Sequence, residues 1–306
     1  MLAAVAARQS LRVDVRLVNV FATVMDTSGR YVAGLSKDDF VLEEDGVPQE
    51  IAHFTQDENL PVSVGIVCDT SGSMQNKLRT AVIAIDRFVR TIHEDDDIFL
   101  MTFSARTSLR QDFTSNRDKL SKALQNITAT GATALYDALN EALIKIRSGQ
   151  HQKRAILLIT DGRDTSSTTP FSEIVRRVRE SELLVYALGI SPATYSDPFE
   201  HVPFSWPPAL PGTRRFPMSG NRDSVDMDVM ETLGTESGGR SFLLSDVLLG
   251  AGNNIERVLA EVAAELRSQY TLGFYPKHPD DHRYHVLGVR TSSGLTVRAR
   301  RGYTAQ

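Results

Sequence analysis

Apolar and polar residues follow two different periods along the chain, and the change of period divides it into three regions. From Ser10 to about Asn59 they alternate, as in LRVDVRLVNVFATV, with interruptions at TSGR and EDGV. A period of two is typical of half-buried strands, and short Gly-containing interruptions are hairpin signals. The first region is therefore predicted to consist of antiparallel strands.

The middle region, from Pro61 to about Ser268, alternates short apolar runs with stretches of helical period. Such alternation is the signature of βα units around a mostly parallel sheet with helices on both faces. The predicted strands are residues 62–68, 98–104, 108–113, 155–160, 183–190 and 240–244. The predicted helices are residues 76–93, 116–127, 134–148, 171–181, 225–236 and 254–268.

The third region returns to a period of two, in QYTLGFYP, RYHVLGVRT and LTVRARRGY. Neither terminal region has enough strands to close a core alone, because isolated hairpins are marginal in water. We therefore predict that residues 10–59 and 269–306 pair as one antiparallel β-sandwich, with an α/β domain of residues 60–268 inserted between them.

Two segments do not fit either period. Residues 1–9 are apolar and carry the small-residue spacing of a cleavage site, so they are either a signal-peptide remnant or a disordered tail. Residues 191–223 are too rich in proline for a helix or strand, and they follow a predicted sheet strand. Their aromatic side chains either contact a partner or pack back as a cover. The candidate partner-binding residues are Tyr195, Phe199, Phe204, Trp206 and Phe216.

Composition narrows the class of protein. The content of 41% hydrophobic and 24% charged residues is that of a soluble globular chain. A net charge of -4 without a dense basic tract argues against nucleic acid as a partner. No apolar run approaches the roughly 18 residues of a membrane span. The single cysteine, Cys68, excludes an intrachain disulfide and is predicted to be a buried core residue.

The stretch VGIVCDTSGSMQNK, residues 64–77, ends an apolar strand in an acid and several hydroxyls. Asp69, Ser71 and Ser73 should lie at the carboxyl end of that strand, the edge where open α/β sheets bind ligands. Their oxygens are ligands for a hard cation, and Gly72 allows a tight turn. The alternative interpretation is that these side chains cap the helix that begins near Asn76.

Two further loops should reach the same edge. ATGATALYDAL presents Thr133 just before a helix, and the strand in AILLITDGRD ends at Asp161. Helix capping would account for the polar side chains of the first loop but not for those of the other two. The sequence therefore predicts a cluster of five oxygen-bearing side chains gathered from three loops.

These motifs, over residues 61–268, resemble the von Willebrand factor A domain with its metal-ion-dependent adhesion site. The resemblance implies a Rossmann-like fold in which five residues coordinate Mg²⁺ directly or through water. Mn²⁺, and less readily Ca²⁺, would substitute for it. An Asp or Glu of a partner protein would complete the ion's coordination. The residues carried over are Asp69, Ser71, Ser73, Thr133 and Asp161. Because Gln75, Asn76 and Lys77 follow the hydroxyls, no second ion is expected beside the first.

The flanking regions, including VNVFATVMDTSGRYVAGLSKDDFVLEEDGVPQEI, resemble a bacterial family of von Willebrand factor A-related proteins described mostly from acidobacteria. Members of that family are often exported, so the resemblance implies an extracytoplasmic location: periplasmic, secreted or surface-associated.

Two other groups of charged or histidine residues are weaker candidates for a functional site. His278, His282 and His285 are a metal-ligand candidate, although the segment is typical of a hairpin turn. The acids of residues 94–97 lie between a helix and a strand and are expected to form a solvent-facing turn at the opposite edge of the sheet.

The function predicted from these residues is a divalent-metal-dependent protein-binding module, not an enzyme. One alternative is a metal-dependent hydrolase, in which the ion activates water. The other is a structural or assembly protein with a vestigial metal site.

Overall fold

The computed structural model describes residues 17–56, 60–191, 225–244, 252–278 and 281–305. The predicted tail of residues 1–9 lies outside these ranges. So do Tyr195, Phe199, Phe204, Trp206 and Phe216.

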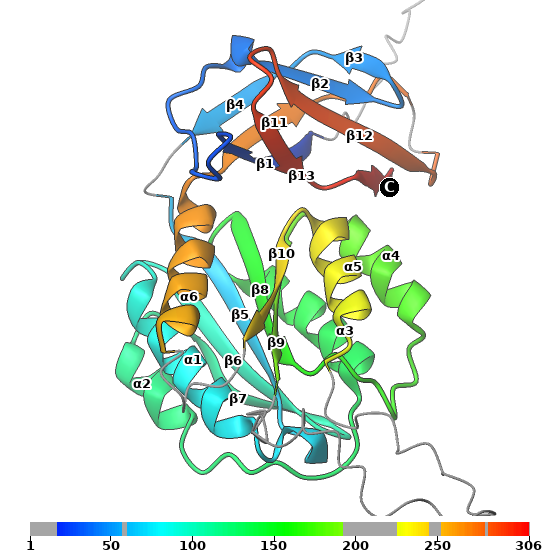
Figure 1. Cartoon of the computed structure of the whole chain (residues 1–306). Coiled ribbons are helices and arrows are strands. Elements are labelled where there is room, and N and C mark those ends of the chain that lie inside the picture. Colours follow the sequence, from blue (N-terminus) through cyan, green and yellow to red (C-terminus); the bar gives the residue numbers. More distant parts are fainter. Residues whose placement is uncertain (1–16, 57–59, 192–224, 245–251, 279–280, 306) are drawn as a thin grey trace, which may run out of the picture.

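A six-stranded sheet forms the centre of the larger, lower part of the molecule (Figure 1). Five of its strands are parallel, and the edge strand β7 runs antiparallel to β6. This confirms the predicted α/β class with a mostly parallel sheet. The strand order is β10 (Arg240–Leu244), β9 (Leu184–Ile190), β8 (Lys153–Thr160), β5 (Val62–Asp69), β6 (Asp97–Phe103) and β7 (Thr107–Thr114).

Helices cover both faces of this sheet. One face packs against α1 (Leu78–Thr91), α2 (Arg117–Ala123) and α6 (Gly252–Arg267). The other packs against α3 (Leu135–Lys145), α4 (Phe171–Glu180) and α5 (Met227–Ser237). Successive side chains of a strand point to opposite faces, so Ile66 joins the first core and Val67 the second. All eight residues of β5 are buried.

Both ends of the chain build the smaller part, shown above the α/β domain in Figure 1. One sheet has the order β13 (Thr296–Ala299), β1 (Val18–Met25), β11 (Tyr270–Phe274) and β4 (His53–Gln56). The other has the order β14 (Gly302–Thr304), β12 (Tyr284–Thr291), β2 (Phe40–Glu44) and β3 (Val47–Gln49). Their strands pair antiparallel, and Val20, Leu42 and Phe274 share one core between them. The predicted sandwich of the two chain ends is confirmed.

A buried acid joins the two parts. Only Ser268 and Gln269 separate α6 from β11. One turn earlier, Glu265 of α6 is fully buried and forms an ion pair with Arg298 of β13. It also accepts a hydrogen bond of 3.4 Å from the Thr23 hydroxyl of β1. A charge this deeply buried needs such partners, so these contacts link the helix to the sandwich.

The acidic run at residues 94–97 corrects one expectation. Asp96 and Asp97 are 5% and 4% exposed, whereas Glu94 and Asp95 face solvent. Asp96 accepts hydrogen bonds from the backbone of Val62 and His93, at 2.8 and 2.9 Å. The prediction of a wholly solvent-facing turn was wrong, because these carboxylates satisfy amides that would otherwise be buried without partners.

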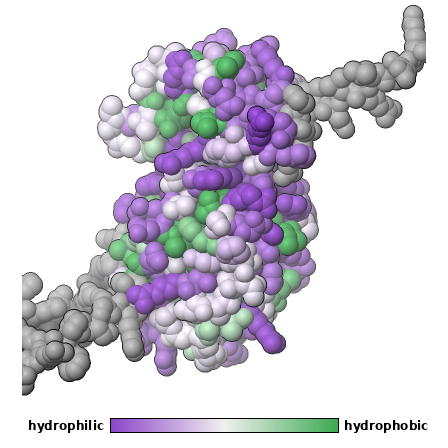
Figure 2. Space-filling view, turned by 90° about the vertical axis from the view of Figure 1, so that its right-hand side faces the viewer, coloured by the Kyte–Doolittle hydropathy of each residue, from purple (hydrophilic) through white to green (hydrophobic). Residues whose placement is uncertain are grey.

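No helix in the described part of the chain is both long and apolar enough to cross a membrane. On the face shown in Figure 2, apolar residues form small patches among polar ones.

Cys68 is fully buried within β5, as predicted. Burial, together with the neighbouring Asp69 carboxylate, raises the pKa of its thiol far above the ordinary value. Because only the thiolate is nucleophilic, we expect native protein to resist labelling by a disulfide reagent such as DTNB. The same protein in denaturant should react fully. Rapid labelling of one thiol per native chain would contradict this packing.

Candidate metal centre

Asp69 is the last residue of β5 and is fully buried. Its Oδ1 accepts a 2.8 Å hydrogen bond from the Ser71 amide, and its Oδ2 accepts one of 2.7 Å from the Thr160 hydroxyl. Helix α1 begins only at Leu78, and no side chain caps it. The alternative in which Asp69 and the hydroxyls serve as helix caps is therefore wrong. Asp69 instead holds the turn that follows it.

The two serine hydroxyls lie together beside this turn. Ser71 is fully buried, and its Oγ lies 3.1 Å from that of Ser73. Oxygens bound side by side to an octahedral Mg²⁺, each at about 2.1 Å, lie about 3.0 Å apart. The spacing of the two hydroxyls therefore fits neighbouring positions on such an ion.

Backbone hydrogen bonds join the second loop to the first. The Gly72 amide donates to the Gly131 carbonyl at 2.9 Å, and the Thr130 amide donates to the Thr70 carbonyl at 2.8 Å. Gly131 has a φ of +85°, a conformation that favours glycine. These contacts bring the buried Thr133, two residues later, to the same edge of the sheet.

The third loop follows β8 and begins with Asp161, which is fully buried. The amides of Thr165 and Ser166 both donate to the Thr133 carbonyl, at 2.8 and 3.0 Å. Between these residues and Asp161, Gly162 has a φ of +79°, and a Cβ there would lie 2.4 Å from the Asp226 carbonyl. The structure thus places Asp69, Ser71, Ser73, Thr133 and Asp161 on three loops that are hydrogen-bonded to one another.

The buried carboxylates give this edge an unusual charge environment. Burial raises the pKa of Asp69 to about 6, against hydrogen bonds that lower it, and the nearby Asp161 carboxylate adds to the rise. A second negative charge so close favours a cation between the loops.

Lys77 supplies a positive charge that the sequence analysis missed. Its side chain is 1% exposed, and its Nζ lies 3.1 Å from Asp161 Oδ2. At a helix start a lysine usually reaches solvent, so the sequence carries no clear signal of this burial. The carboxylates of Asp69 and Asp161 and the ammonium of Lys77 together carry one net negative charge. A divalent cation there would reverse that sign.

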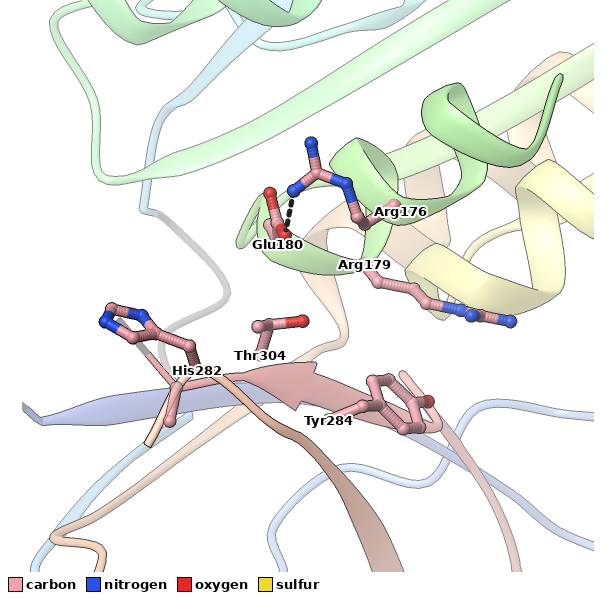
Figure 3. Close-up of a pocket in the computed structure, with 7 residues that line it drawn as sticks. Arg176, Arg179, Glu180, His282, Tyr284 and Thr304 are labelled. Atoms are coloured by element: carbon pink, nitrogen blue, oxygen red, sulfur yellow. Dashed lines mark hydrogen bonds and ion pairs between the residues drawn. The ribbon is translucent and has the colours of Figure 1, made fainter. Parts of the chain in front are cut away.

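A separate cleft of about 450 Å³ lies between α4 and the sandwich (Figure 3). His282 and Tyr284 line it from the sandwich, and Arg176 and Arg179 line it from α4. Arg176 is paired with Glu173 and Glu180, and Arg179 with Glu236, so these guanidinium charges are already compensated. His282 lines this cleft, whereas the rings of His278 and His285 stack on each other with centroids 3.9 Å apart, so the three histidines of the sequence candidate do not form one cluster.

Comparison with known proteins finds a family match within the middle region. Residues 64–163 match the model of the von Willebrand factor type A domain. No curated protein matches the chain significantly.

Solved structures resemble the chain at low identity. Proximal thread matrix protein 1 from the mussel byssus is 13% identical, with a TM-score of 0.51, over 73% of this chain and 51% of that protein. A von Willebrand factor type A protein from Catenulispora acidiphila is 12% identical, with a TM-score of 0.50, over 95% and 74%. BatB from Bacteroides thetaiotaomicron is 20% identical, with a TM-score of 0.49, over 67% and 98%. The first two comparisons show a shared fold.

The buried ion pair makes a direct prediction about stability. In Lys77→Met the Asp161 carboxylate stays buried without its cation, so the free energy of unfolding in EDTA should fall by about 3–5 kcal/mol. Urea denaturation measures this change. Lys119→Met, at an exposed lysine of α2, is the control and should change stability by about 0.5 kcal/mol or less. Equal stability of the two variants would show that the pair is not formed.

Proposed function

Residues 64–163 belong to the von Willebrand factor type A family, and on that premise we propose that the protein is a divalent-metal-dependent protein-binding module. One observation carries the proposal. Two serine hydroxyls lie 3.1 Å apart beside the buried carboxylate of Asp69, on loops hydrogen-bonded to those of Thr133 and Asp161.

The proposed metal ligands are the five residues of these loops, which act directly or through water: Asp69, Ser71, Ser73, Thr133 and Asp161. Two carboxylates and three neutral hydroxyls suit Mg²⁺, with Mn²⁺ as a substitute and Ca²⁺ less suited to so few ligands. Bound there, the ion would supply a coordination position that a carboxylate can complete.

Lys77 determines the charge that a partner meets. With Lys77 in place, the sum over Asp69, Asp161 and Lys77 goes from one negative charge to one positive charge when a divalent ion is added. An Asp or Glu of a partner protein is the side chain that such a centre attracts. Lys77 thus lowers the affinity of the site for the divalent ion and strengthens its attraction for the partner's carboxylate.

The proposal assigns the protein a binding role without chemical turnover. Ser71 Oγ is paired with Ser73 Oγ, and in the described part of the chain neither hydroxyl is hydrogen-bonded to a histidine. The aromatic residues Tyr195, Phe199, Phe204, Trp206 and Phe216 are proposed as further partner contacts, because they come after β9 in the chain and the carboxyl end of β9 lies at the same edge as that of β8. Export from the cytoplasm is part of the proposal and rests on the resemblance of the flanking regions.

Metal binding is tested by thermal unfolding in EDTA and in rising Mg²⁺ or Mn²⁺. An ion that binds only the folded state, at about 100 times its dissociation constant, stabilises by about 2.7 kcal/mol. We expect this shift in the wild type and its loss in Ser71→Ala. Ser108→Ala, at an exposed serine of β7, is the matched control and should keep it. A shift of the same size in Ser71→Ala would overturn the proposed ligand set.

The acidic partner is tested on a peptide array that pairs each Asp or Glu peptide with its Asn or Gln counterpart. We expect binding in Mg²⁺ only to acidic members, and no binding in EDTA or by Ser71→Ala. Lys77→Met should bind Mg²⁺ more tightly but the acidic peptides more weakly, because the substitution removes one positive charge from the metal-loaded edge. Equal binding to acids and amides would contradict recognition through the ion.

A further inference from the structure

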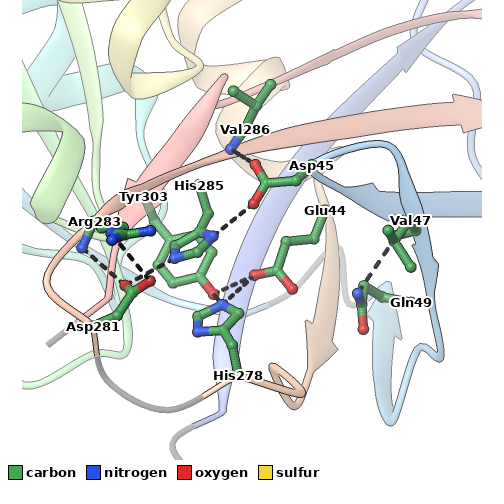
Figure 4. A network of polar contacts seen from close by, with 10 residues as sticks. All are labelled: Glu44, Asp45, Val47, Gln49, His278, Asp281, Arg283, His285, Val286 and Tyr303. Carbon is green, nitrogen blue, oxygen red and sulfur yellow. Dashed lines mark hydrogen bonds and ion pairs between the residues drawn. The ribbon is translucent and has the colours of Figure 1, made fainter.

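Two histidines and three carboxylates gather in the sandwich (Figure 4), whereas Asp69 ends β5 of the α/β domain. Glu44 ends β2, and Asp45 follows it in the turn. His285 lies on β12, which pairs with β2, while His278 and Asp281 come from the connection before β12. Glu44 and His285 are 4% and 7% exposed, so the cluster is built into the sandwich.

The distances within this cluster resemble those of a metal centre. His278 Nε2 lies 3.0 Å from Glu44 Oε1, and His285 Nε2 lies 3.1 Å from Asp281 Oδ1. Two ligands of a tetrahedral zinc ion, bonded at about 2.0 Å, lie about 3.3 Å apart. One ligand atom each of Glu44, His278 and His285 lies within 4.8 Å of the others.

The second nitrogen of His285 is already oriented. Its Nδ1 donates to Asp45 Oδ2 at 2.7 Å, and Asp45 Oδ1 accepts from the Val286 amide at 2.8 Å. A carboxylate that holds one nitrogen of a histidine while the other faces an ion is a common support of metal sites. The Asp45 contact therefore turns Nε2 towards Asp281, as Figure 4 shows.

The charges of the cluster call for a cation. Glu44 accepts a hydrogen bond from the Tyr303 hydroxyl at 2.5 Å and lies against His278, so its buried carboxylate faces neutral groups unless a histidine is protonated. His285 has an acceptor carboxylate at each nitrogen. Either a second proton or a metal ion must lie between His285 Nε2 and Asp281.

We propose that Glu44, His278, Asp281 and His285 form a second metal site, for a transition-type divalent ion such as Zn²⁺. Imidazole nitrogens combined with carboxylates favour zinc over Mg²⁺ or Ca²⁺. The imidazole rings are stacked, with centroids 3.9 Å apart and planes 12° apart, so one ring tilts on binding. His278, 24% exposed and on a connection, is the ring that can tilt. Four protein ligands make the site structural, and it ties the β11–β12 connection to β2.

The test is a zinc titration of metal-stripped full-length protein in excess Mg²⁺, followed by calorimetry. Co²⁺ is the spectroscopic probe, since its tetrahedral complexes absorb visible light much more strongly than octahedral ones. We expect one equivalent of Zn²⁺ and a tetrahedral Co²⁺ spectrum. His278→Gln should weaken binding about 100-fold or more, and Asp45→Asn about 10–100-fold. His282→Gln, a histidine of the same connection outside the cluster, is the matched control and should bind as the wild type.

Three results would overturn the site. One is the absence of stoichiometric zinc binding, which would leave His285 as an imidazolium between Asp45 and Asp281. The second is zinc binding that His278→Gln leaves intact while circular dichroism shows that variant folded. The third is loss of zinc binding in Ser71→Ala, which would place the ion at the Asp69 edge. Because Ser71→Ala also reports on Mg²⁺, failure of this site and failure of the proposed function are distinguishable.

Discussion

Burial of β5 on both of its faces is the constraint on which the rest of the α/β domain depends. An eight-residue strand with no exposed face needs a parallel neighbour on each side and helices above and below. The neighbouring parallel strands end at the same edge of the sheet as β5, so the loops that follow them start close together. Asp69 is polar because it lies at the one end of β5 where the apolar layers stop. The same arrangement directs the amino ends of the parallel strands towards the sandwich (Figure 1).

The buried carboxylates of Asp69 and Asp161 repel each other at this edge unless hydrogen bonds or positive charges compensate them. Hydrogen bonds from Ser71 and Thr160 stabilise the ionised form of Asp69, but they do not remove the field of Asp161. The ammonium of Lys77 offsets part of this negative charge, because its Nζ pairs with Oδ2 of Asp161. An internal lysine is permanent, whereas an ion exchanges with solvent. The chain therefore carries part of its own charge compensation whether or not an ion is bound.

Sequence patterns predicted the elements well, because the periods of apolar residues come directly from burial. The predicted helix at residues 171–181 and strand at 240–244 match α4 and β10 within one residue. The loops of Asp69, Thr133 and Asp161 were predictable as well, since each follows or precedes a strongly patterned element.

Other features had no local signal. Lys77 is a charged residue beside a helix, and only the fold turns it inwards. Asp96 and Asp97 belong to a run of acids that is typical of a solvent-exposed turn. Only the fold brings the amides of Val62 and Gln150 to these two carboxylates. Glu44 and His278 are 234 positions apart, and they meet because β2 pairs with β12 and His278 lies in the connection that leads into β12.

The pairing of the two chain ends also sets an order of events during synthesis. Strand β1 pairs with β11 and β13, and β2 pairs with β12, so the first strands wait for the last ones. At about 5–20 residues per second, a ribosome needs roughly ten to forty seconds to make the intervening domain. That domain has its own cores and can fold in the meantime. The amino-terminal strands, by contrast, leave the ribosome with unpaired edges, and these are open to chaperones or to a second nascent chain until β11 emerges.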